Sequence, residues 1–372
     1  MLNTDPPLLA QRPIPSVPSR PGGIGCINDS DDLSALADAW HALAGGYGPI
    51  EQFSWIQACA QTFAVAGTLR IVTVHDDGRL VAAAPLLRRR IRSVPHLMLL
   101  GVEELYEPMD LPCANAAAAE ALADALLRLH LPLHLQRLPA ASPLAHALCR
   151  QARGRALVAC RPAPGAAYIM LDADWSEPLA KLSPRRRSDL RRAWRRAQSH
   201  GPVRAEVLVP APSEVPALLD LVMAVEARSW KARSGTALLQ DELRRDFYRQ
   251  YALAAAGEGT LRIALLHIGD AIAAAQLAAV AGNGYALLKI GYDERFADCS
   301  PGLLLLQSSI AHAAQQGIAR YELLGLPSAW IEPWTRLQHA CISLRLFPRR
   351  LNGLLALATT LAARAWRGVQ RA

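Results

Sequence analysis

The strongest constraint on the fold of this chain is an internal repeat. Residues 68–75 read TLRIVTVH, and residues 260–267, which begin 192 positions later, read TLRIALLH. Each segment is followed by a short turn containing glycine and then by a second apolar run. Two apolar runs joined by such a turn are typical of an antiparallel hairpin. The sequence therefore predicts the same hairpin twice.

The segments around the two hairpins repeat in the same order. A helical segment precedes each hairpin, and a third strand, a second helix and a short final strand follow it. These segments are residues 53–63, 97–100, 116–129 and 133–138 in the first copy and 247–256, 285–290, 301–316 and 320–324 in the second. The predicted fold class is α+β. Two tandem domains would pack around a pseudo-dyad, each a mixed, mostly antiparallel sheet flanked by helices.

The boundary between the domains is predicted at the Pro/Gly cluster of residues 162–165, because such clusters mark turns and linkers. The length of 372 residues also favours two domains over one. The predicted segments are a disordered Pro-rich arm at 1–23, the first domain at 24–164, the second domain at 165–347 and a basic amphipathic C-terminal helix at 348–372. The second domain is the candidate for catalysis.

Composition excludes several classes of protein. Hydrophobic residues make up 52% of the chain and charged residues 19%, which excludes a disordered protein. The seven Cys include no CxxC pair and no His lies at metal-ligand spacing, so we expect reduced thiols and no metal site. The N-terminal segment lacks the apolar core of a secretory signal, and we expect a cytoplasmic protein. The net charge of +8 suits an anionic ligand or a membrane surface.

A basic helix is predicted over residues 184–196, of which seven are Arg. These side chains fit either a solvated surface or a docking surface for phosphate or an acidic carrier, because guanidinium groups bind phosphate oxygens in pairs. Trp194 is the one aromatic residue interleaved with these arginines, so DNA is not an expected partner. If the helix binds an anion, the expected contacts are Arg191, Arg192 and Arg195.

Residues 285–302 contain the most informative local pattern. A strand that carries Lys289 is followed by a polar segment and then by Ser300-Pro301-Gly302, which opens an apolar helix. Ser at the N-cap and Pro at the first helical position are a favourable helix start. A helix N-terminus offers free N–H groups and the positive end of the helix dipole, which favour an anion, although most such starts are only caps. The pattern leaves both alternatives open.

Several short motifs together resemble the GNAT-type acyltransferases of the CelD/BioF2-like group, which are similar to Fem-type aminoacyl ligases. The motifs of the second half are Gly291-Tyr292-Asp293, Ser300-Pro301-Gly302 and YELLG at 321–325. Further matches are Phe53-Ser54-Trp55, Arg187 with DLRR at 189–192, and Ser229-Trp230 with Arg233. The resemblance covers roughly residues 24–334. It implies two tandem GNAT folds, in agreement with the repeat.

The chain departs from this family at two places. GNAT enzymes usually hold the pyrophosphate of acetyl-CoA with a Gly-rich loop that also contains Arg or Gln, where this chain has DCSPG at residues 298–302. After Gly325 the family pattern contains Glu, Tyr and Lys, where this chain has LPSAWIEPW at residues 326–334. Either the substrate differs, or the role of that Lys, such as steadying charge on the reacting carbonyl, passes to another cation. Lys289 and Lys231 are the nearest by type.

The resemblance implies an acyltransferase that moves an acyl group from acyl-CoA or an acyl carrier protein to an amine or hydroxyl. The acceptor would be a cell-envelope saccharide, a lipid or a small metabolite. The catalytic candidates are Glu226, Lys289, Tyr292 and Asp293. The candidates for binding the donor are Ser300, Gly302, Arg191, Arg192 and Arg195. The candidates for binding the acceptor are Trp230, Lys231 and Arg233.

Acyl transfer without a covalent enzyme intermediate requires a base for the acceptor proton. Glu226 or Asp293 is the expected base, and Tyr292 could protonate the leaving thiolate. His267 and His312 are further candidates, but a single His on an apolar strand or helix is more often structural. No metal is expected to take part.

Two functions of other classes remain open. A Fem-like ligase would take its acyl group from aminoacyl-tRNA, and a long basic face would serve it. A carrier-binding protein without activity is the other alternative, and the absence of Glu, Tyr and Lys after Gly325 favours it.

The C-terminal segment is rich in leucine and ends in basic residues. The run from Leu351 to Ala363 is too short and too interrupted to cross a bilayer. A leucine-rich helix with basic flanks and Trp366 is typical of an interfacial anchor, here at the inner face of the membrane. The alternative is a terminal helix that docks on the second domain and covers its sheet edge.

Overall fold

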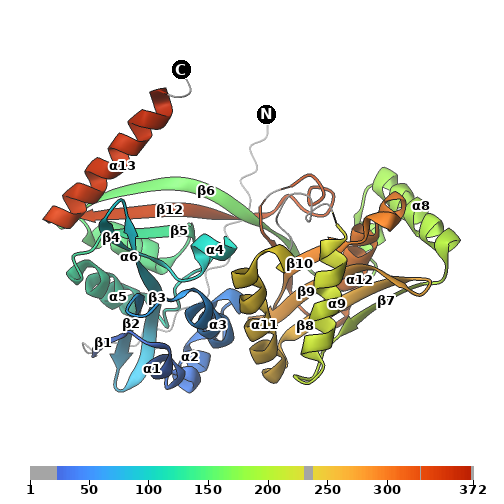
Figure 1. Cartoon of the computed structure of the whole chain (residues 1–372), viewed down its shortest axis with the longest axis horizontal. Helices are drawn as coiled ribbons and strands as arrows, with labels where there is room; N and C mark the ends of the chain where they lie inside the picture. The colour runs from blue at the N-terminus through green and yellow to red at the C-terminus, as the bar shows by residue number, and fades with distance from the viewer. Residues whose placement is uncertain (1–22, 230–237, 327, 370–372) are drawn as a thin grey trace.

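The computed structural model describes residues 23–229, 238–326 and 328–369. Both predicted hairpins form (Figure 1), and they are β2 (Leu69–Asp76) with β3 (Arg79–Ile91) and β8 (Leu261–Ile268) with β9 (Ala271–Ala281). In the first turn Asp77 and Gly78 both have positive φ, as the two central residues of a type I′ turn require. Gly269 has positive φ in the second turn.

Within the described residues, twelve strands form one sheet in the order β1-β2-β3-β4-β5-β12-β6-β11-β10-β9-β8-β7. The remaining strands are β1 (Ile24–Ile27), β4 (Val94–Leu99), β5 (Leu133–Pro139), β6 (Ala156–Met170), β7 (Val203–Leu208), β10 (Gly284–Tyr292), β11 (Arg320–Leu324) and β12 (Gln338–Pro348). Two neighbouring pairs, β4 with β5 and β10 with β11, are parallel, and the other pairs are antiparallel. The mixed, mostly antiparallel character that we predicted for both copies is confirmed.

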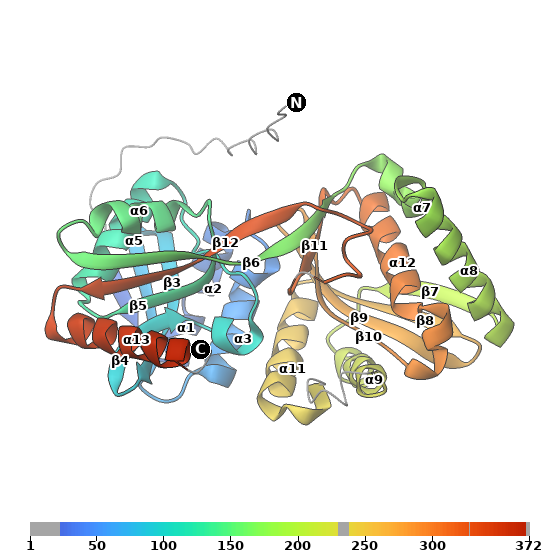
Figure 2. The same ribbon diagram turned by 90° about the horizontal axis from the view of Figure 1, so that it is seen from above.

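The two halves are joined where the sequence predicts a linker. Residues 162–165 lie inside β6, which pairs with β12 over most of its length and with β11 at its end (Figure 2). β12 follows the second half in the chain, yet it also pairs with β5 of the first half. The predicted linker is therefore a strand, and residues 338–348 lie on the sheet of the first half. Each half gives one strand to the centre of a shared sheet.

Helices cover both faces of this sheet (Figures 1 and 2). They are α1 (Ser30–Ser34), α2 (Ala37–Ala44), α3 (Phe53–Phe63), α4 (Val102–Leu105), α5 (Ala116–Arg128), α6 (Pro143–Gln151), α7 (Pro178–Lys181), α8 (Pro184–His200), α9 (Val215–Ala227), α11 (Glu242–Gly257), α12 (Pro301–Gln315) and α13 (Leu351–Val369). β8 shows why two layers are needed, because Ile263 and Leu265 face one buried cluster and Ala264 and Leu266 face another.

The equivalent helices α3 and α11 pack against each other across the two halves. The Trp55 ring lies edge-on to the rings of Phe247 at 4.8 Å and Tyr251 at 4.9 Å between centroids. Phe63 stacks on Phe247 at 5.5 Å. Such aromatic pairs add about 0.5–1.5 kcal/mol each beyond the apolar area that they bury. The largest buried cluster therefore runs through both halves and joins them.

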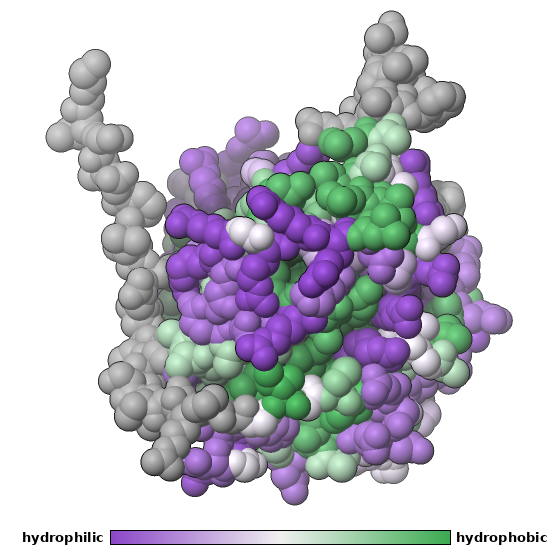
Figure 3. Space-filling view, turned by 90° about the vertical axis from the view of Figure 1, so that its left-hand side faces the viewer, coloured by the Kyte–Doolittle hydropathy of each residue, from purple (hydrophilic) through white to green (hydrophobic). Residues whose placement is uncertain are grey.

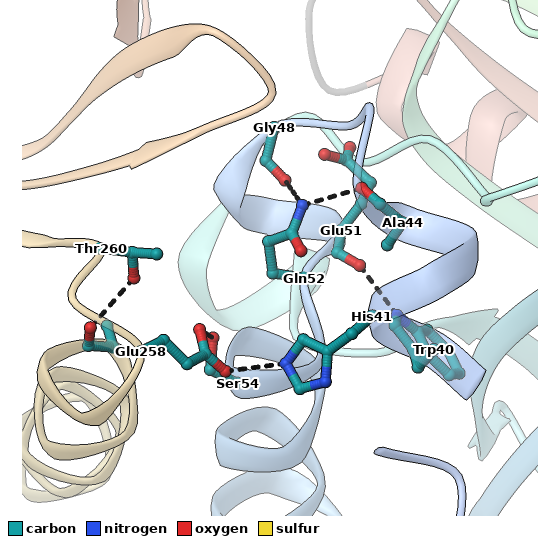
Figure 4. A network of polar contacts seen from close by, with 10 residues as sticks. Trp40, His41, Ala44, Gly48, Glu51, Gln52, Ser54, Glu258 and Thr260 are labelled. Atoms are coloured by element: carbon teal, nitrogen blue, oxygen red, sulfur yellow. Dashed lines mark hydrogen bonds and ion pairs between the residues drawn. The ribbon is translucent and has the colours of Figure 1, made fainter. Parts of the chain in front are cut away.

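Polar contacts extend this interface at the ends of α3 and α11 (Figure 4). The Glu258 carboxylate accepts a hydrogen bond from Ser54 at 2.9 Å and lies 3.1 Å from His41 Nε2. Beside it, Trp40 donates to the Glu51 carbonyl at 2.9 Å, which fixes the turn that leads into α3. The contacts of Glu258 join the two halves, and the Trp40 hydrogen bond orders the first half beside them.

The Glu51 side chain predicts an unusual dependence of stability on pH. Burial raises the pKa of Glu51 to about 8, with the Asp110 carboxylate adding to the effect and a hydrogen bond from the Asp110 N–H opposing it. The folded chain then keeps a proton that the unfolded chain loses near pH 4, so the free energy of unfolding falls as the pH rises from about 4 to about 8. In Glu51→Gln this side chain stays neutral at every pH. The free energy of unfolding of the variant, relative to that of the natural protein, should therefore increase by about 2–3 kcal/mol as the pH rises from about 6 to about 8.

This prediction is checked by urea unfolding of both proteins at a series of pH values. Glu103→Gln is the matched control, because the Glu103 side chain is exposed and its removal should not change the pH profile. Parallel profiles for Glu51→Gln and the natural protein would contradict the prediction.

Candidate active site

A cavity opens where β10 leaves β11. β10 pairs with β9 from Gly284 to Tyr292, but it pairs with β11 only from Gly284 to Ala286. Beyond Ala286 the two parallel strands separate, and a cavity of about 640 Å³ lies along the open part. Its walls are largely apolar, with Ile290 and Leu323 among the lining residues. Residues 105–107 of the first half also line it, so both halves build the site.

The first turn of α12 lines this cavity. Ser300 takes the N-cap position that the sequence predicts, but its φ of 48° is left-handed and its side chain makes no cap hydrogen bond. Pro301 has no N–H, and the amides of Leu303 and Leu304 donate to the Ser300 carbonyl. In the described part of the chain the Gly302 N–H has no acceptor. Because it also lies at the positive end of the helix dipole, it can donate to an anionic or carbonyl oxygen.

Gly302 leaves space that a ligand can use. A Cβ added at this position would lie 3.5 Å from Tyr292 Cδ1 and 3.8 Å from Ile290 Cδ1, which is ordinary van der Waals contact. Glycine is therefore not required by the packing of the helix. Tyr292, one of the predicted catalytic residues, lines the same cavity.

Lys289 and Glu107 bring opposite charges to this cavity. The Lys289 ammonium lies 5.0 Å from the centroid of the Tyr248 ring. Glu107 is 6% exposed, and its Oε2 accepts a hydrogen bond from the Gly325 N–H at 3.2 Å. Burial raises the pKa of Glu107, and Lys289 and Arg137 oppose the shift. A carboxylate of raised pKa in a cavity between two halves is a candidate for proton transfer.

Arg137 holds this corner of the site together. Its side chain is fully buried and donates to the carbonyls of Gly325 at 2.7 Å and of Pro164 and Gly165 at 3.2 Å each. Gly325 therefore has its N–H bound by Glu107 and its carbonyl bound by Arg137, both from the first half. We interpret Arg137 as a positioning residue, because it orients Gly325 and does not line the cavity.

The two carboxylates predicted as the base lie outside this cavity. Asp293 forms ion pairs with Arg295 at 2.8 Å and Arg228 at 3.1 Å, and hydrogen bonds from Arg295 lower its pKa. A strongly paired carboxylate is a poor base. Glu226 is buried and accepts a hydrogen bond from the Leu238 N–H at 2.9 Å. Its backbone also packs on Gly291, where an added Cβ would lie 3.0 Å from the Glu226 Cα.

The two histidine candidates do not line the cavity. His267 lies 2.9 Å from a carboxylate oxygen of Glu206 on the neighbouring strand. Burial and Arg262 lower the pKa of His312, which lies in the last turn of α12. Trp230, Lys231 and Arg233 lie outside the described residues. Over the described ranges, no group of His, Cys, Asp and Glu is arranged to hold a metal ion.

The predicted basic helix forms as α8. Some of its arginines line a surface hollow, and Arg192 does not. Arg191 and Arg195 line an open hollow of about 1010 Å³ together with Arg187, Trp194 and Gln307 of α12. Arg192 does not line this hollow, and its guanidinium lies 3.9 Å from the Asp189 carboxylate. Gln307 is five residues beyond Gly302, or about 7.5 Å along the helix axis. The hollow therefore lies beside the helix whose first turn lines the cavity.

Comparison with known proteins agrees with this geometry. Residues 184–331 match the family model described as an acetyltransferase (GNAT) domain. The second half is thus similar to a GNAT-type acetyltransferase domain, and the fold of the whole chain is of the Fem-like kind. No curated protein matches the sequence.

Solved structures of low sequence identity share the whole fold. The structure of FemX is 12% identical, with a TM-score of 0.59, and the match covers 88% of this chain and 98% of that chain. The structure of L-PGS from Bacillus licheniformis is 12% identical, with a TM-score of 0.52, and the match covers 90% of this chain and 97% of that chain. These likenesses concern the fold alone.

Proposed function

We propose that this protein transfers an acyl group from an acyl thioester to an amine or hydroxyl of its acceptor. The observation that carries the proposal is the cavity between β10 and β11. It combines apolar walls, a free amide at Gly302 and a buried carboxylate, Glu107, from the other half. The apolar walls fit an acyl chain, and the amide fits a thioester or phosphate oxygen. The donor is acyl-CoA or an acyl carrier protein, and a cytoplasmic location would give access to both.

The reaction needs three groups on this chain. The acceptor nitrogen or oxygen attacks the thioester carbonyl carbon, and its proton passes to Glu107. The carbon–sulfur bond then breaks, and Tyr292 protonates the leaving thiolate. Solvent returns the proton to Tyr292 and removes the proton from Glu107, so each cycle yields one acylated acceptor and one thiol. Both side chains line the same cavity.

Lys289 replaces the cation that the family pattern places after Gly325. It lines the cavity, and its charge acts on Glu107. An ammonium at this wall would stabilise the negative charge on the carbonyl oxygen as the acceptor attacks. The acceptor is proposed by class, as a cell-envelope saccharide, a lipid or a small metabolite. It would bind at the wall of the cavity that the first half contributes.

A panel of acyl-CoA donors tests this proposal. We expect one donor to raise Tm and to release thiol when an acceptor is added. Binding without thiol release would instead support a non-catalytic carrier-binding protein. If no acyl-CoA binds, no thiol is released and tRNA co-purifies with the protein, the result would support a Fem-like ligase. The basic hollow beside α12 would then bind the tRNA.

The basic hollow of α8 is proposed to bind the anionic part of the donor or its carrier. Replacing Arg191, Arg192 and Arg195 together with Gln removes three positive charges, so the donor KM should rise by about tenfold and its dependence on salt should flatten. The side chains are exposed, so the fold should be retained. Steady-state kinetics at two or more salt concentrations measure both effects.

The matched control removes the same charge from the first half. Arg79, Arg128 and Arg153 are exposed, and their replacement by Gln should leave the donor KM unchanged. Equal KM values for the two triple variants would show that α8 is only a solvated surface.

A further inference from the structure

The C-terminal helix α13 uses one side to pack on the first half. Ala356 is fully buried and forms a small cluster with Phe347 of β12 and Val94 of β4. Gly353 lets the first turn of α13 fold closely over the end of β12, because an added Cβ would clash with the Pro348 carbonyl oxygen. The alternative of a docked terminal helix fits this packing, but α13 lies on β12 and β4, on the part of the sheet that belongs to the first half (Figure 1). No helix in the described ranges is long and apolar enough to cross a membrane.

The other side of α13 presents a row of leucines to solvent. Leu351 is 73% exposed, Leu354 53%, Leu355 46% and Leu361 56%. Their spacing follows one face of a helix. In Figure 3, apolar atoms gather at the upper right of the coloured surface, with hydrophilic atoms beside them. Single exposed leucines are common, but a row of four on one helix needs a partner. We call this row the leucine face.

Arginines surround the leucine face. Arg349 and Arg350 precede the helix and are exposed. From the turn between β3 and β4, the exposed Arg92 donates to the Thr359 carbonyl at 3.3 Å, so that turn lies against α13. Arg90 in the same hairpin is also exposed. From residue 349 to residue 372 the sequence contains five Arg and no Asp or Glu. The surface thus joins apolar and positively charged groups.

We propose that the leucine face and its arginines dock on an anionic lipid bilayer. Leucines that lie in the interface bury apolar area among the acyl chains, and the arginines bind the negative headgroups around them. A second copy of the chain fits this surface less well. A symmetric dimer through the leucine face would bring the arginines of both copies together, and like charges across an interface are repulsive. This inference goes beyond the proposed function and does not depend on it.

Vesicle sedimentation with the full chain tests the proposal. Vesicles of phosphatidylglycerol and phosphatidylcholine in equal parts should bind the protein, and vesicles of phosphatidylcholine alone should bind it at least about tenfold more weakly. Binding to the anionic vesicles should weaken as salt rises. Equal binding to both vesicle types, or binding to neither, would overturn the proposal.

Two triple variants separate the leucine face from general surface hydrophobicity. Replacing Leu354, Leu355 and Leu361 with Gln should lower vesicle binding by at least about tenfold. Its Tm should stay close to that of the natural protein, because these side chains are exposed. The matched control replaces Leu239, Leu243 and Leu253, which are exposed on the second half, and should bind vesicles normally. Unchanged binding of the first variant would overturn the proposal, as would a dimer in light scattering that this variant abolishes.

Discussion

Glu107→Gln is expected to lower kcat by about 10²- to 10⁴-fold, the usual effect of losing a general base. Glutamine keeps the size of the side chain and an oxygen that can accept the hydrogen bond from the Gly325 N–H. The variant should therefore fold, and its thermal unfolding should resemble that of the natural protein. What it loses is the ability to take the acceptor proton. Thiol release under saturating donor and acceptor measures the change.

The pH profile adds a readout that a purely structural role would not move. A base must be ionised, and burial raises the pKa of Glu107 above its usual range. The activity of the natural protein should therefore rise with pH through a pKa above about 4.3, the ordinary value for Glu. In Glu107→Gln the residual activity should be flat over the same pH window.

Glu103→Gln is the matched control for this experiment. Glu103 lies in α4, four residues before Glu107 in the chain, but its side chain is 51% exposed and pairs with Arg89. The control should keep full activity and the same pH profile. A Glu107→Gln variant that is as active as this control would remove Glu107 from the mechanism and leave it a structural contact of Gly325.

The elements that the sequence predicts well are those set by local pattern. The helix predicted at 53–63 is α3 residue for residue, and the helices predicted at 116–129 and 301–316 are α5 and α12 to within one residue. Both hairpins form because their turns contain glycine and their strands alternate between two buried faces. These signals lie within a few residues of each other, so they can be recognised in one sequence without knowledge of long-range contacts.

The joining of the two halves could not be predicted in the same way. Pro164 and Gly165 read as a linker, but they lie where the pairing of β6 with β12 shifts register. Their carbonyls are bound by the buried Arg137, and an added Cβ at Gly165 would lie 2.8 Å from the His339 carbonyl oxygen. The cluster is therefore an irregularity inside a strand. Its partners are distant in the sequence, which no local pattern reveals.

The sequence predicts only those parts of the candidate site whose residues lie close together in the chain. Lys289, Tyr292, Ser300 and Gly302 belong to one strand and the helix after it, and the structure brings them to one cavity. Glu107 belongs to the other half and has no counterpart in the motifs of the second. The signal that could have found it is the presence of two carboxylates, Glu107 and Asp110, in the largely apolar segment 105–112, because such groups must be paired or functional when buried.

Gly302→Val is expected to lower kcat/KM for the donor by on the order of 10²-fold, because small displacements of a bound substrate have effects of this size. The new Cβ fits beside Tyr292 and Ile290, but the two methyl groups beyond it would occupy the space next to the Gly302 N–H. The donor could then no longer approach that amide. Steady-state kinetics with the donor identified by the acyl-CoA panel measure the loss.

The stability of Gly302→Val decides between the two interpretations of Ser300-Pro301-Gly302. Gly257→Val is the matched control, since Gly257 ends α11 and an added Cβ there meets nothing within 4 Å. It carries the same helix-propensity change without touching the cavity. If the Gly302 amide binds the donor, both variants unfold at similar temperatures and only Gly302→Val loses activity. If Gly302→Val loses stability but each folded molecule turns over normally, the motif is only a helix start, and the donor must lie elsewhere in the cavity.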